Sequence, residues 1–286
     1  MSVPPSSAQV MASAMAVGNE NRESESFKKF FESWLVEQNQ HLNELLTAST
    51  QHSNNNSSNQ GEENEIRQLV DRVIKHYELY YAVKSSWAKQ DVLSMLTPPW
   101  RSSLEDAFLW IGGWRPTMAF HLLYSKSGLQ LEARLGHAEF YNFDLDLDLA
   151  DLRPAQLEGI DSLQKDRIRE EKEITEKMAK QQETVADSSM VDLSHVVSEL
   201  MRKRSSEDGG ARLEEQEVQL SVESALGPKE EGLEQILQLA DDLRLRTLKG
   251  VIEILSPIQA VHFLIAAAEL HLRFHDWGKR KDARQS

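Results

Sequence analysis

Two histidines near the end of the sequence have a type and spacing that suit chemistry. His271 and His275 stand four residues apart in the stretch ELHLRFHDWGKR, where apolar residues recur at helical spacing. On a helix both rings lie on one face, where imidazoles bind metal ions or form hydrogen bonds inside a core. No motif-matched third ligand accompanies them, which argues against a structural zinc site.

Haem iron is more permissive, because one axial histidine is enough to hold it. Neighbouring rings on one helix face cannot lie on opposite sides of a single iron. If His271 and His275 serve haem, one binds and the other supports it, or a second helix or chain supplies the far ligand. A pair of core histidines with satisfied ring nitrogens is the alternative.

The helix that must position these rings is predicted from Pro257 to Trp277. Ser256 is a suitable N-cap, Pro257 fits the first helical position, and Gly278 is expected to end the helix. The apolar face, with the two histidines at its edge, consists of Val261, Leu264, Ile265, Ala268 and Leu272. The polar stripe predicted opposite it consists of Gln259, His262, Glu269, Arg273 and Asp276. This helix is therefore expected to be largely buried.

A second unusual stretch is LWIGGWRP, in which Trp110 and Trp114 flank a Gly-Gly pair and Arg115 follows. One interpretation is a tight corner between helices, where glycines permit close approach and the aromatic rings fill the core. The other is a ligand pocket made by Trp110, Trp114 and Arg115, in which the guanidinium binds an anion or carboxylate.

Apolar periodicity and capping signals predict an all-α fold: a single domain of about eight helices, with long antiparallel helices and disordered tails. The helices are expected at 26–48, 62–96, 103–113, 115–128, 154–186, 190–204, 213–255 (interrupted near Gly227 and Pro228) and 257–277. The charged 154–186 segment is predicted to be an exposed helix or a poor coiled coil.

The helical domain is assigned to residues 24–280, between a disordered tail at 1–23 and a basic tail at 281–286. Internal flexible segments are expected near 51–61, 136–153 and 204–211. Within the second of these, Asp144, Asp146 and Asp148 resemble the start of a calcium loop. Leu149 occupies the position that requires glycine there, so an acidic loop is the better interpretation.

Composition excludes several classes of protein. The 286 residues carry 46 acidic and 32 basic side chains, a net charge of −14 that opposes non-specific binding to nucleic acid or anionic membranes. Cysteine is absent, so disulfides, zinc–thiolate sites and cysteine catalysis are excluded. No nucleophile motif, phosphate-binding loop or transmembrane stretch occurs, and a non-enzymatic protein of the nucleus or cytoplasm is expected.

Three anchors give the chain a specific resemblance: Trp34 in the first helix, PPWRSSLEDAFLWIGGWRP, and SPIQAVHFL with HLRFHDWG. Over roughly Ser26 to Lys279 the chain resembles the plant Delay of Germination-like (seed dormancy control) family. The same domain forms the C-terminal part of TGA bZIP transcription factors. Residues 1–25 contain one Arg and no Lys, and no leucine heptad follows, so direct sequence-specific DNA binding is not expected.

The resemblance implies an α-helical regulator of abscisic-acid signalling or transcription that acts through protein partners. Type 2C protein phosphatases and TGA-type factors are the implied partners, and a homodimer is also compatible. The family's phosphatase-contacting segment lies in the first helix, which makes Phe30, Phe31, Trp34 and Leu35 partner candidates, although FFESWLVEQ departs from the family motif. The HLxxHxWG pattern implies haem as a cofactor, bound through His271 and His275.

Overall fold

The computed structural model describes residues 20–54, 60–136, 148–204 and 211–285. These residues are helical almost throughout and contain no strand beyond an isolated bridge between Trp110 and Gly113. The long helices are α2 (Glu20–Asn54), α3 (Gln60–Ala88), α6 (Met118–Gly136), α7 (Pro154–Glu183), α8 (Ser188–Arg204), α9 (Ala211–Ile254) and α10 (Pro257–Asp282). The shorter elements are α4 (Val92–Leu96), α5 (Ser103–Asp106), η1 (Asp148–Asp151) and η2 (Thr184–Ala186). The all-α prediction is confirmed.

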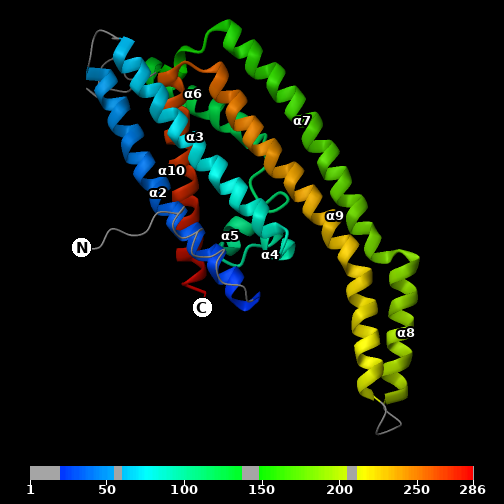
Figure 1. Ribbon diagram of the computed structural model, residues 1–286. Coiled ribbons are helices and arrows are strands. Elements are labelled where there is room, and N and C mark those ends of the chain that lie inside the picture. The colour runs from blue at the N-terminus through cyan, green and yellow to red at the C-terminus, as the bar shows by residue number, and fades with distance from the viewer. Residues whose placement is uncertain (1–19, 55–59, 137–147, 205–210, 286) are drawn as a thin grey trace, which may run out of the picture.

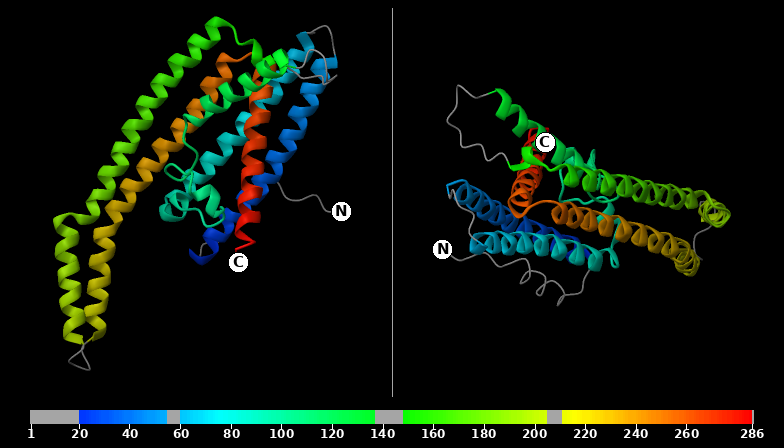
Figure 2. Two further views of the ribbon diagram at one scale, coloured as in Figure 1. Left: turned by 180° about the vertical axis from the view of Figure 1, so that it is seen from behind. Right: turned by 90° about the horizontal axis from the view of Figure 1, so that it is seen from above.

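Long antiparallel helices form the body of the molecule (Figure 1). Helices α2 and α3 lie side by side, and α7 and α9 make a second pair. Seen from above, the two pairs lie in adjacent layers (Figure 2). Helix α10 contacts α2, α3, α5 and α6, and is therefore the helix that joins the parts of the body.

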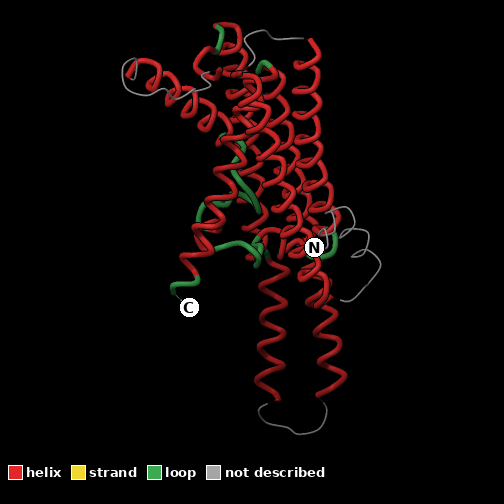
Figure 3. Tube along the Cα trace, turned by 90° about the vertical axis from the view of Figure 1, so that its left-hand side faces the viewer, coloured by secondary structure: helices red, strands yellow, loops and turns green. Residues whose placement is uncertain are grey.

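A two-helix arm projects from this body. It consists of α8 and the first part of α9, which extend together beyond the other helices (Figures 1 and 3). Helix α8 packs mainly on α9. We call residues 185–226, apart from the undescribed 205–210, the arm.

Two large apolar clusters hold the body together. The first joins α2, α3, α6, α7, α9 and α10 through aliphatic side chains around Leu45, Val73 and Leu264. The second joins α2 and α3 to α4 through an aromatic cluster of Phe27, Phe30, Phe31, Trp34, Tyr80, Trp87 and Trp100. Their rings pack mostly tilted or edge to face, an arrangement that aromatic pairs favour.

Capping residues explain where several helices begin. Ser102 caps α5 in a reciprocal capping box with Glu105, and Ser256 does the same for α10 with Gln259. Pro257 occupies the start of α10 as the sequence predicted. A cap that the sequence analysis overlooked explains one error: Asp91 accepts a hydrogen bond from the Ser94 amide, so the predicted helix to Leu96 breaks into α3 and α4.

Glycine and proline end fewer helices than predicted. Helix α6 runs through Gly128, where nothing approaches the missing side chain. Helix α9 continues through Gly227 and Pro228, although both α9 and the α7–α8 pair change direction near this level (Figure 1). The Gln181 amide donates to the Lys229 carbonyl across this bend, which supports the backbone where proline weakens the helix.

Gly278 does not end α10, which continues to Asp282. A Cβ at Gly278 would lie 2.0 Å from the Ser102 hydroxyl oxygen, so this glycine permits α5 to pack against α10. Asp282, predicted to belong to a basic tail, accepts hydrogen bonds from the amide and hydroxyl of Ser103.

The polar stripe predicted on α10 is also wrong in part, because Gln259 and His262 are buried. The predicted tail at 1–23 and the predicted flexible segments fall largely on 1–19, 55–59, 137–147 and 205–210, which lie outside the described residues. Residues 20–23 and the described edges of the internal segments are helical, apart from Leu152 and Arg153 between η1 and α7. None of the described helices has the length and apolar character that a membrane crossing requires.

We predict opposite effects for alanine at two helical glycines. Gly128→Ala should raise the free energy of unfolding by about 0.5–1 kcal/mol, because helical glycine costs backbone entropy and space is open there. Gly278→Ala should lower it by about 1–3 kcal/mol, because the methyl group collides with the cap of α5. Thermal denaturation followed by circular dichroism checks both, with about 2–4 °C expected per kcal/mol. Equal shifts in the two variants would contradict the close packing of α5 on α10.

Candidate functional site

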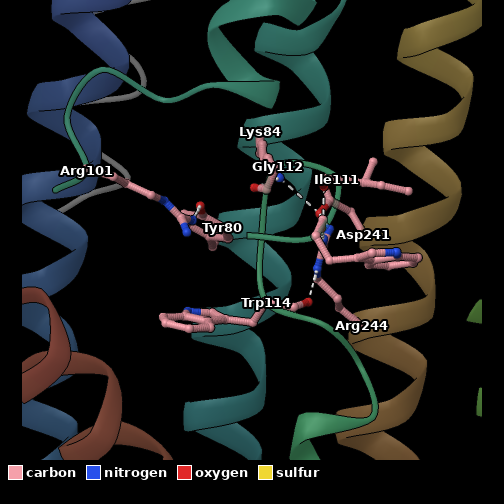
Figure 4. A network of polar contacts seen from close by, with 9 residues as sticks. Tyr80, Lys84, Arg101, Ile111, Gly112, Trp114, Asp241 and Arg244 are labelled. Carbon is pink, nitrogen blue, oxygen red and sulfur yellow. Dashed lines mark hydrogen bonds and ion pairs between the residues drawn. The ribbon is translucent and has the colours of Figure 1, made fainter. Parts of the chain in front are cut away.

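A buried ion network holds the segment of residues 107–117 between α3 and α9 (Figure 4). The ammonium of Lys84 donates to Asp241 at 3.0 Å and to the Gly112 carbonyl at 2.8 Å. Arg244 also pairs with Asp241 and donates to the carbonyls of Ile111, at 2.9 Å, Trp110 and Trp114. Lys84, Asp241 and Arg244 are all nearly inaccessible, so this network fixes the segment from inside.

This network explains why the helix predicted at 103–113 ends at Asp106. Buried carbonyl groups need hydrogen-bond partners, and a helix supplies them from its own amides. Here the side chains of Lys84 and Arg244 supply them instead, so the segment can leave the helix without losing hydrogen bonds. Ile111 and Gly112 then adopt positive φ values of 47° and 66°, and a Cβ on Gly112 would lie 2.5 Å from the Met95 carbonyl oxygen.

The structure separates the two tryptophans of the predicted ligand pocket, while the guanidinium carbon of Arg115 lies 5.9 Å from the centroid of the Trp110 ring. Trp110 packs between α7 and α9 against Ile174 and Leu243, and its indole donates to Thr175 at 3.0 Å. Trp114 lies on the other side, beside Phe274 of α10 at 5.4 Å between ring centroids. The sequence therefore correctly indicated a glycine corner with core aromatic rings, but the two tryptophans do not face one site.

Arg115, the predicted anion-binding residue, already has a carboxylate partner. It pairs with Glu171 of α7 at 3.0 Å, and Glu171 also accepts hydrogen bonds from the amide and hydroxyl of Thr117. This buried carboxylate ties α7 to the 107–117 segment, whereas most other side chains of α7 are exposed, as the sequence predicted for this charged helix. The Arg115 side chain remains half-exposed.

A cavity of about 200 Å³ nevertheless lies beside this segment. Helices α3, α9 and α10 and the stretch from Gly112 to Ala119 line it. Trp114 and Arg115 belong to its wall, and Trp110 does not. Lys84, Arg101 and His271 also reach it, so the cavity combines apolar walls with several polar groups.

The two C-terminal histidines have different surroundings. Nδ1 of His275 lies 3.0 Å from both carboxylate oxygens of Glu105, and its ring packs edge-on against Phe31. Burial of Glu105 tends to raise its pKa, but hydrogen bonds from His275 and Ser102 outweigh burial and lower that pKa to about 2. His275 therefore faces a fixed carboxylate on α5.

His271 faces the cavity. Its ring lies 5.5 Å from the Trp34 ring and 6.5 Å from that of Trp114, and its buried Nε2 has no hydrogen-bond partner among the described residues. His76 also contacts this indole, and its ring stacks on that of Trp34 with 4.5 Å between the centroids. Burial lowers the pKa of His271 to about 4 and that of His76 to about 3, so both rings are neutral in the folded protein at pH 7.

Haem does not fit this arrangement as it stands. The cavity beside His271 is smaller than the 300–1,000 Å³ typical of sites for drug-sized ligands, and haem exceeds that ligand size. His275 is the better candidate for a ligand, because a carboxylate on one ring nitrogen orients many metal-binding histidines. The described residues also bring no three potential metal ligands together. Haem binding through His271 and His275 stays a prediction.

The partner candidates of the first helix turn out to be core residues. Phe30, Phe31 and Trp34 are each 1% exposed and pack in the aromatic cluster, while Leu35 is partly buried beside it. A partner that approaches α2 would meet exposed residues such as Val36 instead. The helical spacing that singled out these residues marked the buried face of α2.

Sequence reasoning missed Lys84, Arg101, Asp241 and Arg244. Each of these residues stands in a helix or turn among residues of mixed polarity. Their positions in the sequence do not indicate that their side chains lie close together beside one cavity. One signal was present: Asp241 and Arg244 are three residues apart, which places them on one side of a helix. Glu105 was not singled out either, although its carboxylate accepts hydrogen bonds from Ser102 and lies 3.0 Å from Nδ1 of His275.

We predict that acid weakens the fold through His76 and His271. In the unfolded chain these rings take up protons below about pH 6.5, whereas in the folded protein they do so only near pH 3 and pH 4. The unfolded state therefore binds more protons, so the free energy of unfolding is fully present above pH 6.5 and falls as the pH drops toward 4.

Urea denaturation at pH 7.0, 6.0 and 5.0 measures this effect. His76→Gln and His271→Gln should each flatten the dependence by up to about 1.4 kcal/mol per pH unit. His121→Gln, at an exposed position, is the control and should keep the wild-type slope. An unchanged slope in both core variants would contradict the assignment.

Comparison with known proteins shows which family the chain is similar to. The profile of the Seed dormancy control family matches residues 41–125. Protein DOG1-like 4 of Arabidopsis thaliana is 31% identical over 90% of this chain and 94% of its own length. Protein RESPONSE TO ABA AND SALT 1, from the same plant, is 27% identical over 88% and 95%. Transcription factor TGA6 is 28% identical over 88% of this chain but only 61% of its own length. The chain belongs to the seed dormancy control (DOG1-like) family.

Proposed function

We propose that this protein is a non-enzymatic regulator of the seed dormancy control type, which acts through protein partners in abscisic-acid-linked signalling or transcription. The names of the relatives support a role in abscisic-acid signalling or transcription, since one is named for its response to abscisic acid and others are transcription factors. The observation that carries the proposal is the arm, whose geometry suits binding better than catalysis.

The arm presents apolar side chains that the body does not cover. Val185, Val191, Val196 and Leu220 are each more than half exposed. Exposed apolar residues that lie together mark sites of protein association, and we infer that these residues form such a surface. Helix α8 contributes little to the body, so its presence is better explained by a partner than by stability.

Two classes of partner follow from the family. A TGA-type factor similar to this chain is one. A type 2C protein phosphatase is the other, and it is proposed from the family resemblance alone. In the first case the chain would be a dimerising cofactor without DNA recognition of its own. Nuclear or cytoplasmic residence and a homodimer belong to the same proposal, and a small-ligand sensor is the alternative function.

Charged substitutions on the arm test the proposal. We expect Val191→Glu with Val196→Glu to weaken the pull-down of a purified phosphatase or TGA-type factor by at least about tenfold, since a charge replaces apolar contact. Thermal stability should change little, because both side chains are exposed. Val36→Glu, at a similarly exposed site on α2, is the matched control. If Val36→Glu alone weakens binding, the partner docks on α2; if neither variant does, the arm is not the interface.

Haem binding at His271 and His275 is proposed from the family resemblance alone. Titration of hemin should then produce a shift of the Soret band that decreases in His271→Ala and in His275→Ala. His195→Ala, on the exposed side of α8, is the control. Wild-type titration curves in both α10 variants would remove these residues as ligands.

A further inference from the structure

The cavity beside the 107–117 segment concentrates positive charge in an acidic protein. The chain carries a net charge of −14, yet four cationic side chains line this space: Lys84, Arg101, Arg115 and Arg244. Asp241 forms ion pairs with both Lys84 and Arg244, and Glu171 forms an ion pair with Arg115. Burial lowers the pKa of Lys84 to about 7, and neither of these two carboxylates forms an ion pair with Arg101 in the described part of the chain.

Arg101 is the clearest case. Its side chain belongs to a residue only 8% exposed, and it reaches across to Tyr80, whose hydroxyl accepts a hydrogen bond at 3.3 Å (Figure 4). The other two guanidinium nitrogens, Nε and Nη1, are buried and have no hydrogen-bond partner among the described residues. A buried guanidinium without its full set of acceptors is costly, and an anion is the partner that removes this cost.

A second polar atom at the cavity is similarly unused. Nε2 of His271 is buried and unpartnered within the described part of the chain, and the charge of Arg101 is close enough to lower the pKa of His271. Two separate side chains, from different elements, therefore keep hydrogen-bonding capacity at one cavity. A carboxylate ligand has two acceptor oxygens, which can accept hydrogen bonds from the guanidinium of Arg101 and from the imidazole of His271.

The remaining wall is largely apolar and aromatic. Trp34, Tyr81, Trp114, Leu122 and Phe263 contribute to it. The volume of about 200 Å³ is slightly larger than the 150 Å³ of an engineered cavity that takes up benzene. The cavity is therefore large enough for a ligand with one ring and too small for a ligand with a long alkyl chain or a macrocycle.

We propose that this cavity binds a small organic carboxylate with a body the size of one ring, whose charge pairs with Arg101. The apolar body lies against the aromatic wall, and His271 offers a hydrogen bond to a second oxygen. This site differs from the predicted one, because Arg101 replaces Arg115 as the anion-binding residue. It is independent of the arm, so either proposal can fail without the other.

Benzoate is the probe, with benzyl alcohol and acetate as controls that lack the charge and the ring. Isothermal titration and thermal shift should show saturable binding of benzoate at one site, at least about tenfold tighter than either control. Wild-type protein that does not bind benzoate at about 10 mM, or binds benzyl alcohol equally, would overturn the proposal.

Arg101→Met separates a binding role from a structural one. The variant should lose benzoate binding by at least about tenfold, while its melting temperature without ligand equals or exceeds that of the wild type. Arg67→Met, an exposed arginine on α3, and Arg115→Gln should both keep binding within about threefold. A lower melting temperature in Arg101→Met together with unchanged benzoate binding would make Arg101 a structural residue and reject the site.

A cavity-filling variant provides a test that leaves every charge in place. Ala267 lines the cavity, and phenylalanine there should occupy the space of the ring. Ala267→Phe is expected to lose benzoate binding and to keep the helical circular dichroism spectrum. Undiminished binding in this variant would show that benzoate binds elsewhere on the protein, which contradicts the proposal.

Discussion

Hydrogen bonds from buried side chains to the backbone of residues 107–117 are the interaction on which the rest of the molecule depends. Arg244 and Lys84 donate hydrogen bonds to the carbonyl oxygens of residues 110–112 and 114. Asp241 pairs with both cationic side chains. Because these contacts replace helical hydrogen bonds, the chain can turn at Gly112 and send one tryptophan to each side. The same turn contributes Gly112 to the wall of the cavity, which α3, α9 and α10 also line.

Much of the fold followed from local signals. Apolar periodicity located the long helices, and the Ser256-Pro257 pair marked the start of α10 at the correct residue. The errors arose where tertiary contacts overrode local preference. Gly278 looked like a helix end, but its missing side chain makes room for Ser102, a residue from the middle of the chain. Pro228 looked like a break, but a side chain from α7 supports the backbone there.

The candidate site was less predictable than the fold, for a related reason. Trp110, Trp114 and Arg115 are adjacent in sequence, yet a tight turn directs neighbouring side chains in different directions. Arg101 and His271 are remote in sequence, and only the packing of α10 onto the body brings them near one cavity. Apolar spacing identified Phe30, Phe31 and Trp34 as a helix face, but it could not distinguish a face used for a partner from one used for the core.

The central place of α10 has a consequence for how the protein is made. The ribosome synthesises α2 and α3 long before α10, yet α10 is the helix that covers their shared face. Until α10 emerges, the aromatic rings around Trp34 have no cover on that side, and the contacts that bury them span most of the chain. Contacts between distant parts of a chain form slowly because loop closure costs entropy first. Nascent chains of this protein therefore expose this aromatic surface until translation passes α10, and exposed apolar surface of this kind favours aggregation.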